Sequence, residues 1–126
     1  MNNFIRAYLE CILWAELDES TPTGGLPLED NYGVEDFAPE ALCRIVEDCK
    51  RFQEENRADL DQYNHPQYTA DELGGHDFWL TRNGHGCGFW DRDCLPEDVG
   101  KRLTQAAERA GECNVYVGDD GLIYLV

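Results

Sequence analysis

The chain has 126 residues, with 26 acidic and 10 basic side chains and a formal net charge of −16. Hydrophobic residues make up 42% of the chain and aromatic residues 11%, which is enough for a core and excludes a disordered chain. The acidic excess repels nucleic acid and anionic membranes, so we expect direct binding to neither. No signal peptide is evident and no apolar run reaches the 18 residues of a membrane span, which predicts a cytoplasmic protein. At this length, residues 1–126 should form a single globular domain.

The six cysteines show neither CxxC nor CxxH spacing, so a structural zinc site lacks its usual pattern. Disulfides need an exported chain, which nothing in the sequence indicates. We therefore expect free thiols, most of them buried, and neither a metal nor a cofactor.

The first predicted element is a helix from Asn3 to about Leu17, capped by Asn2 or Asn3. Five apolar residues follow the spacing i, i+3, i+4, i+7, i+8 and form one face: Ile5, Tyr8, Leu9, Ile12 and Leu13. Trp14 lies off the centre of that face and should therefore reach a second surface.

A long acidic loop is expected over about residues 18–38, because Thr-Pro-Thr-Gly-Gly and Leu-Pro break both periodicities. Such a length is unusual inside a compact domain. Four apolar residues favour an ordered loop that lies over the core: Leu28, Tyr32, Val34 and Phe37.

Two further helices should each begin at a proline, which is favoured at the first helical position. One starts at Pro39 and runs to about Leu60 or Tyr63, before Pro66. The other starts at Leu95-Pro96 and ends at Gly111.

The segment Gly74–Asp93, GGHDFWLTRNGHGCGFWDRD, has two aromatic runs around a glycine-rich turn, which predicts a central β-hairpin. Before it, Thr69 and Glu72 form a capping-box pattern for a short helical turn that Gly74-Gly75 should end. Whichever of Trp79 and Trp90 faces the helices should be buried.

The C-terminal segment Cys113–Val126 places Asp120-Gly121 between two β-rich runs, a strong hairpin signal. Together the two predicted hairpins would form an antiparallel sheet of about four strands, with about three helices packed on it. The predicted class is α+β.

The central segment also gathers polar residues that could form an alternative loop site: His76, Asp77, Arg82, Asn83, His85, Asp91 and Arg92. A hydrolase could use His85 as general base with Asp91 orienting it, but no spacing fixes that geometry. A metal site built from His76, His85 and Cys87, with His65, lacks a recognised spacing. GHGCG matches neither a Walker loop nor a dinucleotide fingerprint.

The stretch Gly75–Val126, with its GHDFWLTRNGHG block, its GFWDR block, a helix and a terminal VGDDG hairpin, resembles a family of small acidic proteins of bacteriophages and related mobile elements. LEDNY and the helix that begins at Ala-Pro-Glu match more loosely, and Cys87 stands where a small residue is expected. The resemblance implies a phage setting in a host bacterial cytoplasm. It implies no activity and transfers no functional residue.

Charge is concentrated in the N-terminal half, where residues 16–40 contain eight acids and no Lys or Arg. This favours a protein that binds a basic protein surface, in its sharpest form a DNA mimic that inhibits a host nucleic-acid-binding or defence protein. The residues expected to bind the partner are Glu16, Asp18, Glu19, Glu29, Asp30, Glu35, Asp36, Glu47 and Asp48.

Two other functions stay open. One is a small enzyme or ligand-binding domain with its site at the His76–Arg92 loop. The other is a non-catalytic structural phage protein whose acidity serves solubility. The sequence favours a binding role over an enzymatic one, and it does not specify the oligomeric state.

Overall fold

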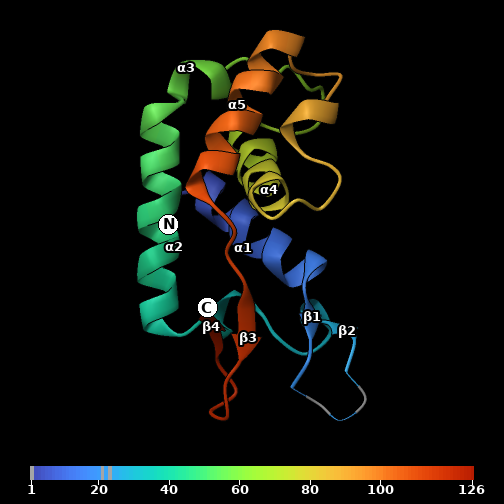
Figure 1. Ribbon diagram of the computed structural model, residues 1–126, viewed down its shortest axis with the longest axis vertical. Coiled ribbons are helices and arrows are strands. Elements are labelled where there is room, and N and C mark those ends of the chain that lie inside the picture. Colours follow the sequence, from blue (N-terminus) through green and yellow to red (C-terminus); the bar gives the residue numbers. More distant parts are fainter. Residues whose placement is uncertain (1, 21, 23) are drawn as a thin grey trace.

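The computed structural model describes residues 2–20, 22 and 24–126, and within them it has five α-helices and four short strands (Figure 1). Thr21 and Thr23 of the predicted loop lie outside the described residues. The helices are α1 Asn3–Ala15, α2 Pro39–Glu55, α3 Arg57–Leu60, α4 Ala70–Arg82 and α5 Glu97–Ala110. The strands are β1 Leu17–Asp18, β2 Leu26–Pro27, β3 Val115–Val117 and β4 Ile123–Leu125. The α+β class is confirmed, but the described strands form two separate two-stranded sheets and not one four-stranded sheet. The described helices number five and not the expected three, because one predicted helix is divided at Asn56 and α4 occupies part of the predicted central hairpin.

Helix α1 forms as its sequence predicts. The Asn2 side chain accepts a hydrogen bond from the backbone N–H of Ile5 at 2.9 Å, which caps the first turn. All five residues of the predicted apolar face are buried. Trp14 lies off this face and is 55% exposed, as expected.

The predicted central hairpin is wrong, because its first part, residues 74–82, lies in helix α4 and the rest forms no strand. The capping box between Thr69 and Glu72 is present, but the helix continues through Gly74 and Gly75 to Arg82. A Cβ on Gly75 would lie 2.1 Å from the carbonyl oxygen of Phe4 on α1. The glycines therefore permit close approach of α1 and α4, the most extensive contact between two elements in the fold, instead of ending the helix.

The aromatic residues of α4 lie at the centre of the core. Trp79 is fully buried, and its ring meets that of Tyr8 edge-on with centroids 5.4 Å apart. Phe78 stacks on Phe52 of α2 with centroids 4.0 Å apart. Trp90 is 56% exposed, so the buried tryptophan is Trp79, which reaches the core from a helix and not from a strand.

The rest of the predicted hairpin is a loop followed by the short 3-10 helix η3, Phe89–Asp91. Gly84, Gly86 and Gly88 all have positive φ angles, which their lack of a Cβ permits. Phe89 is buried, and its backbone N–H donates to Thr81 Oγ1 at 3.2 Å. The loop is therefore folded back against α4.

The second predicted helix is interrupted. Asn56 has φ −126° and ψ 21°, so the chain bends between α2 and α3. The predicted start of α2 at Pro39 is confirmed, and so is the stop after α5, where Gly111 has φ +83°.

The predicted acidic loop contains two 3-10 helices, η1 Leu28–Asp30 and η2 Val34–Asp36, and it includes strand β2. Its Leu28 and Phe37 are buried, so the described residues 24–38 of this loop lie over the core as expected. Strands β1 and β2 are only two residues long, and the segment joins the C-terminal hairpin through a single bridge between Phe37 and Ile123. The C-terminal hairpin is present as predicted, with Tyr116 opposite Tyr124.

Both hairpins lie at the same end of the long axis, the lower end in Figure 1, while α3 and the start of α5 lie at the opposite end. None of the described helices is long and apolar enough to cross a membrane.

Candidate functional site

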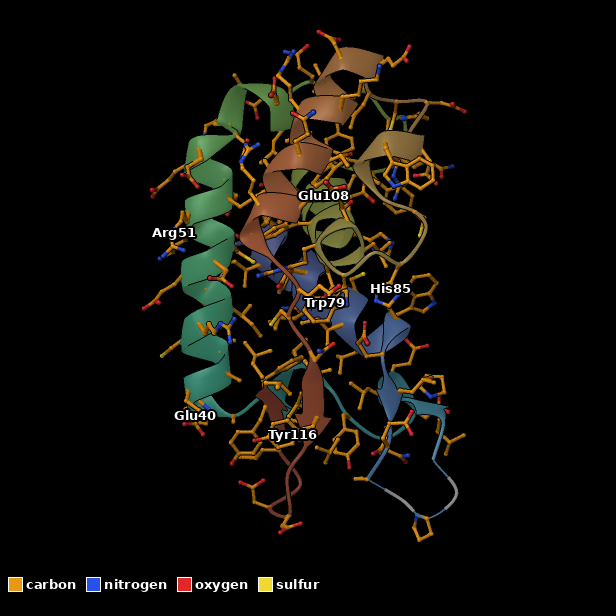
Figure 2. The ribbon with its side chains drawn as sticks, viewed as in Figure 1. Glu40, Arg51, Trp79, His85, Glu108 and Tyr116 are labelled. Carbon is orange, nitrogen blue, oxygen red and sulfur yellow. The ribbon has the colours of Figure 1, made fainter. Side chains whose placement is uncertain are left out.

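The lower end of the molecule collects acidic residues from two distant parts of the sequence. We call residues 17–41 and 114–126 the hairpin end. It contains nine Asp or Glu residues and no Lys, Arg or His. Figure 2 places Glu40 and Tyr116 there, with Arg51 and Glu108 farther along the molecule. The fold therefore gathers an acidic region at one end of the molecule, and Arg44 of α2 borders it, where its Nη1 donates to the carbonyl of Val126 at 3.5 Å.

Seven of the nine carboxylates at the hairpin end are exposed. They are Glu19, Glu29, Asp30, Glu35, Glu40, Asp119 and Asp120. None of the ion pairs found among the described residues involves any of the seven. Their charge is available to a partner.

Sequence reasoning missed Glu40, Asp119 and Asp120 as members of this surface. The last two lie in the turn of the C-terminal hairpin, about 80 residues from Glu40. Nothing in the local sequence links these segments. The bridge between Phe37 and Ile123 brings them together.

Three of the predicted partner-binding residues instead stabilise the fold. Asp18 is 4% exposed and accepts hydrogen bonds from the backbone and hydroxyl of Ser20, at 2.9 and 2.6 Å. Glu16 Oε2 accepts from the indole N–H of Trp79 at 2.8 Å and lies 2.7 Å from His85 Nε2. Asp48 pairs with a buried arginine, described below. All three carboxylates are therefore engaged within the fold.

Of the other predicted partner-binding residues, Asp36 is half-buried and accepts a hydrogen bond from the N–H of Gly33 at 2.8 Å. Glu47 is exposed on α2, where Arg44, Lys50 and Arg51 flank it in the sequence. Glu19, Glu29, Asp30 and Glu35 remain as exposed acids of the hairpin end.

The hairpin end also exposes apolar surface beside its carboxylates. Leu17, Leu26 and Tyr116 are each about half exposed, at 48%, 50% and 50%. Tyr116 stacks on Tyr124 with ring centroids 5.5 Å apart, and both line a hollow of about 220 Å³ together with Glu40. Exposed aromatic residues among polar ones are typical of protein-binding surfaces.

In the alternative loop site, Asp77 is fully buried and internally paired. Arg92 binds it through Nε at 2.9 Å and Nη2 at 2.7 Å, and the Tyr63 hydroxyl donates to it at 2.7 Å. The hydrogen bonds to Asp77 raise the pKa of Arg92, and burial raises the pKa of Tyr63. The carboxylate is therefore occupied on both oxygens and fixes the loop to α4.

Arg82 is the second internal centre. Its Nε donates to the carbonyl of Gly111 at 2.8 Å, and its Nη1 donates to Tyr8 Oη and Asp48 Oδ2, both at 3.1 Å. Its Nη2 donates to the carbonyl of Ala110, also at 3.1 Å. Arg82 therefore joins α4 to α1, α2 and the end of α5.

The remaining loop-site residues also contact the protein. Asn83 donates to the carbonyl of Trp79 and accepts from the N–H of Cys113, while Asp91 accepts from the N–H of Gly88. The fold does not bring His85 to Asp91 as a dyad, because the acid 2.7 Å from His85 is Glu16. His76 packs on Trp14 and faces a separate cleft. The seven residues thus do not form one catalytic centre.

The thiols and metal-ligating groups give little chemistry. All six cysteines are free, and burial raises the pKa of Cys11, Cys49, Cys87 and Cys113, which disfavours the reactive thiolate. Within the part of the chain that the structure describes, no three His, Cys, Asp or Glu residues gather as metal ligands.

No protein-family model, curated protein or solved structure matches this chain.

Proposed function

We propose that the chain is an acidic protein-binding module whose hairpin end binds a basic protein surface. The observation that carries this proposal is the gathering of seven exposed carboxylates at one end of the fold, from two segments that contain no Lys, Arg or His, with Arg44 of α2 at their border. Long-range attraction of this kind accelerates association and selects basic partners.

The exposed apolar residues of the same end support a docking role over simple solubility. Leu17, Leu26 and Tyr116 could form the dehydrated centre of an interface that the carboxylates surround. An acidic surface that serves only solubility has no need of such exposed residues.

In its sharpest form the proposal is that the partner normally holds nucleic acid, so that these carboxylates occupy positions of phosphates. The resemblance of Gly75–Val126 to small phage proteins supports a host bacterial cytoplasm as the setting and a host nucleic-acid-binding or defence protein as the target.

The test compares two variants with matched charge. The first carries Glu19→Lys, Asp30→Lys, Glu35→Lys and Glu40→Lys at the hairpin end. The second carries Glu54→Lys, Glu55→Lys, Asp61→Lys and Glu108→Lys, all exposed positions outside the hairpin end. Each reversal adds two charges, so both variants have a net charge of −8 in place of −16.

Each protein is immobilised and used to capture proteins from bacterial lysate at low and high salt. We expect the parent and the second variant to retain a partner that the first variant loses. Captured partner should be released by salt and by added double-stranded DNA. Equal capture by both variants would show that only total charge matters. If added DNA does not displace the captured partner, the DNA-mimic form of the proposal is contradicted, whereas the proposal that the hairpin end binds a basic protein surface still stands.

A further inference from the structure

A cleft of about 880 Å³ lies between α1 and α4, bordered by the loop at residues 65–68. This volume is within the range of ligand sites. Six of its lining residues matter here: Trp14, Glu29, His65, Tyr68, Glu72 and His76. Glu29 also belongs to the hairpin end, so the cleft is continuous with the acidic surface.

Aromatic rings form its walls. Trp14 is 55% exposed and its ring lies 5.5 Å from that of His76, centroid to centroid. Tyr68 is 53% exposed and its ring lies 5.1 Å from that of His65. Two large rings left open in one cleft are suited to stacking on a planar or cationic group.

The two histidines are packed into the cleft wall. Burial lowers the pKa of His76, which favours its neutral form. His65 Nδ1 accepts hydrogen bonds from the backbone N–H groups of Gln67 and Tyr68, at 3.0 and 3.3 Å.

The two arginines of the cleft are already paired. Arg6 Nε lies 3.2 Å from Glu10 Oε1, and Arg92 is held by both oxygens of Asp77. Two carboxylates are left over, because no ion pair of the described residues involves Glu29 or Glu72. Glu72 accepts only hydrogen bonds from Thr69. The cleft therefore has a negative excess beside open aromatic rings.

We propose that this cleft binds an arginine side chain on a basic segment of the partner, with the guanidinium stacked on Trp14 and paired with the free carboxylates. Arginine fits better than lysine, because its planar group stacks on rings and forms two parallel hydrogen bonds to a carboxylate. The inference rests on the proposed function, since it names the side chain by which a basic partner would be held.

The test uses the full chain and three synthetic peptides of equal length: Gly-Arg repeats, Gly-Lys repeats and Gly-Glu repeats. Binding is followed by NMR through the three tryptophan indole N–H signals, assigned with single Trp→Phe variants. We expect the Arg peptide to shift the Trp14 signal and to leave that of Trp90 unchanged. Trp90 is a matched control, because it is 56% exposed on η3.

Substitutions sharpen the result. Trp14→Ala should weaken binding of the Arg peptide about tenfold, whereas Trp90→Ala should change it less than twofold. Glu72→Gln should weaken it about threefold, since glutamine preserves the helix cap and removes the charge. The Lys peptide should bind more weakly than the Arg peptide, and the Glu peptide should not bind. An equal effect of the two tryptophan variants, or equal binding of the Arg and Glu peptides, would overturn the inference.

The outcome is separable from that of the proposed function. If the hairpin-end variant loses its partner while Trp14→Ala keeps it at full affinity, only the cleft inference fails. If the Arg peptide binds at Trp14 while the hairpin-end variant captures as well as the parent, the cleft inference stands and the proposed role of the hairpin end fails.

Discussion

Polar side chains have opposite environments in two regions of the molecule. One region is the contact between α1 and α4, and the other is the hairpin end. Around α4, Asp77 and Arg82 are almost fully buried, and each is held by several hydrogen bonds. At the hairpin end, seven carboxylates face solvent and none forms an ion pair with a described residue. Across the described residues, no buried side-chain nitrogen or oxygen lacks a hydrogen-bond partner.

The two regions differ because burial makes an unpaired charge costly, whereas solvent makes it cheap. A charged group in the core must therefore serve the fold, as Asp77 and Arg82 do, and the partly buried Glu16 and Asp48 are also paired internally. A charged group at the hairpin end is free for a partner. Substitutions should separate the two regions, with stability changing at one and binding at the other.

The largest expected effect on stability is that of Trp79→Ala. Trp79 is fully buried and its indole donates to Glu16, so its removal leaves a cavity and takes one hydrogen bond from the core. We expect the free energy of unfolding to fall by about 3–5 kcal/mol. Trp90→Ala should lower it by less than about 1 kcal/mol, because that side chain is 56% exposed. Urea unfolding of both variants measures the difference, and equal losses would place both rings in equivalent surroundings.

The second largest expected effect is a fall in the free energy of unfolding at alkaline pH. Burial raises the pKa of Cys11 and Cys49 above the value of 9.0 that they have when unfolded. The stability that these two protonated thiols contribute is complete below pH 9. It is lost as the pH rises toward their pKa values in the folded chain, because only the unfolded chain then releases the protons. Relative to its value well below pH 9, the free energy of unfolding at pH 10 should be lower by about 1.4 kcal/mol for each of these thiols.

Unfolding curves at pH 8 and pH 10 measure this loss. Cys49→Ala should remove its share of the pH dependence, and Cys11→Ala should likewise remove its own. A pH-independent stability across this range would contradict the burial of the two thiols.

Gly75→Ala should destabilise the chain although Gly→Ala inside a helix ordinarily stabilises by about 1 kcal/mol. The new Cβ would lie 2.1 Å from the carbonyl oxygen of Phe4, so the two helices must move apart. We expect a loss of about 1–3 kcal/mol. Gly74→Ala should cost less, because its Cβ meets side chains and not backbone, the edge of the Phe4 ring at 2.9 Å and Leu60 Cδ2 at 3.2 Å. Differential scanning calorimetry of both variants tests this, and a higher melting temperature for Gly75→Ala would refute the close helix contact.

The smallest expected effect on stability is that of the fourfold charge reversal at the hairpin end. All four side chains are exposed, so we expect a change within about 1 kcal/mol. The same variant should lose most of its association rate with the partner, because electrostatic attraction acts mainly on that rate. A large loss of stability would show that these carboxylates serve the fold.

Local signals predicted most of the helices and the C-terminal hairpin. Asn2, Pro39, Gly111 and Asp120-Gly121 each act within a few residues of the chain, and each is found at the predicted position. Helix α4 was misassigned although its capping box was recognised. A Gly-Gly pair can end a helix, or it can lie inside a helix and allow a neighbouring helix to pack closely. The sequence of Gly74 and Gly75 does not distinguish these roles, and only their contact with Phe4 on α1 does.

The candidate site was partly predictable. The acid-only segment was evident, but the exposure of each carboxylate depends on partners far away in the sequence, as for Glu16 with Trp79 and His85. The cleft was indicated only by the off-face position of Trp14. The sequence did not indicate that Tyr68 and Glu72 line this cleft, because nothing in it places the loop before α4 beside α1.

The account depends most on the hairpin end being the surface that touches the partner. Zero-length carbodiimide crosslinking in bacterial lysate tests this directly, since it joins a carboxylate to a lysine only where the two are in contact. Mass spectrometry then identifies the joined residues. We predict crosslinks at Glu19, Asp30, Glu35, Glu40 or Asp119. Crosslinks confined to Glu54, Glu55, Asp61 and Glu108 would contradict the account, because they would place the partner on the opposite part of the molecule.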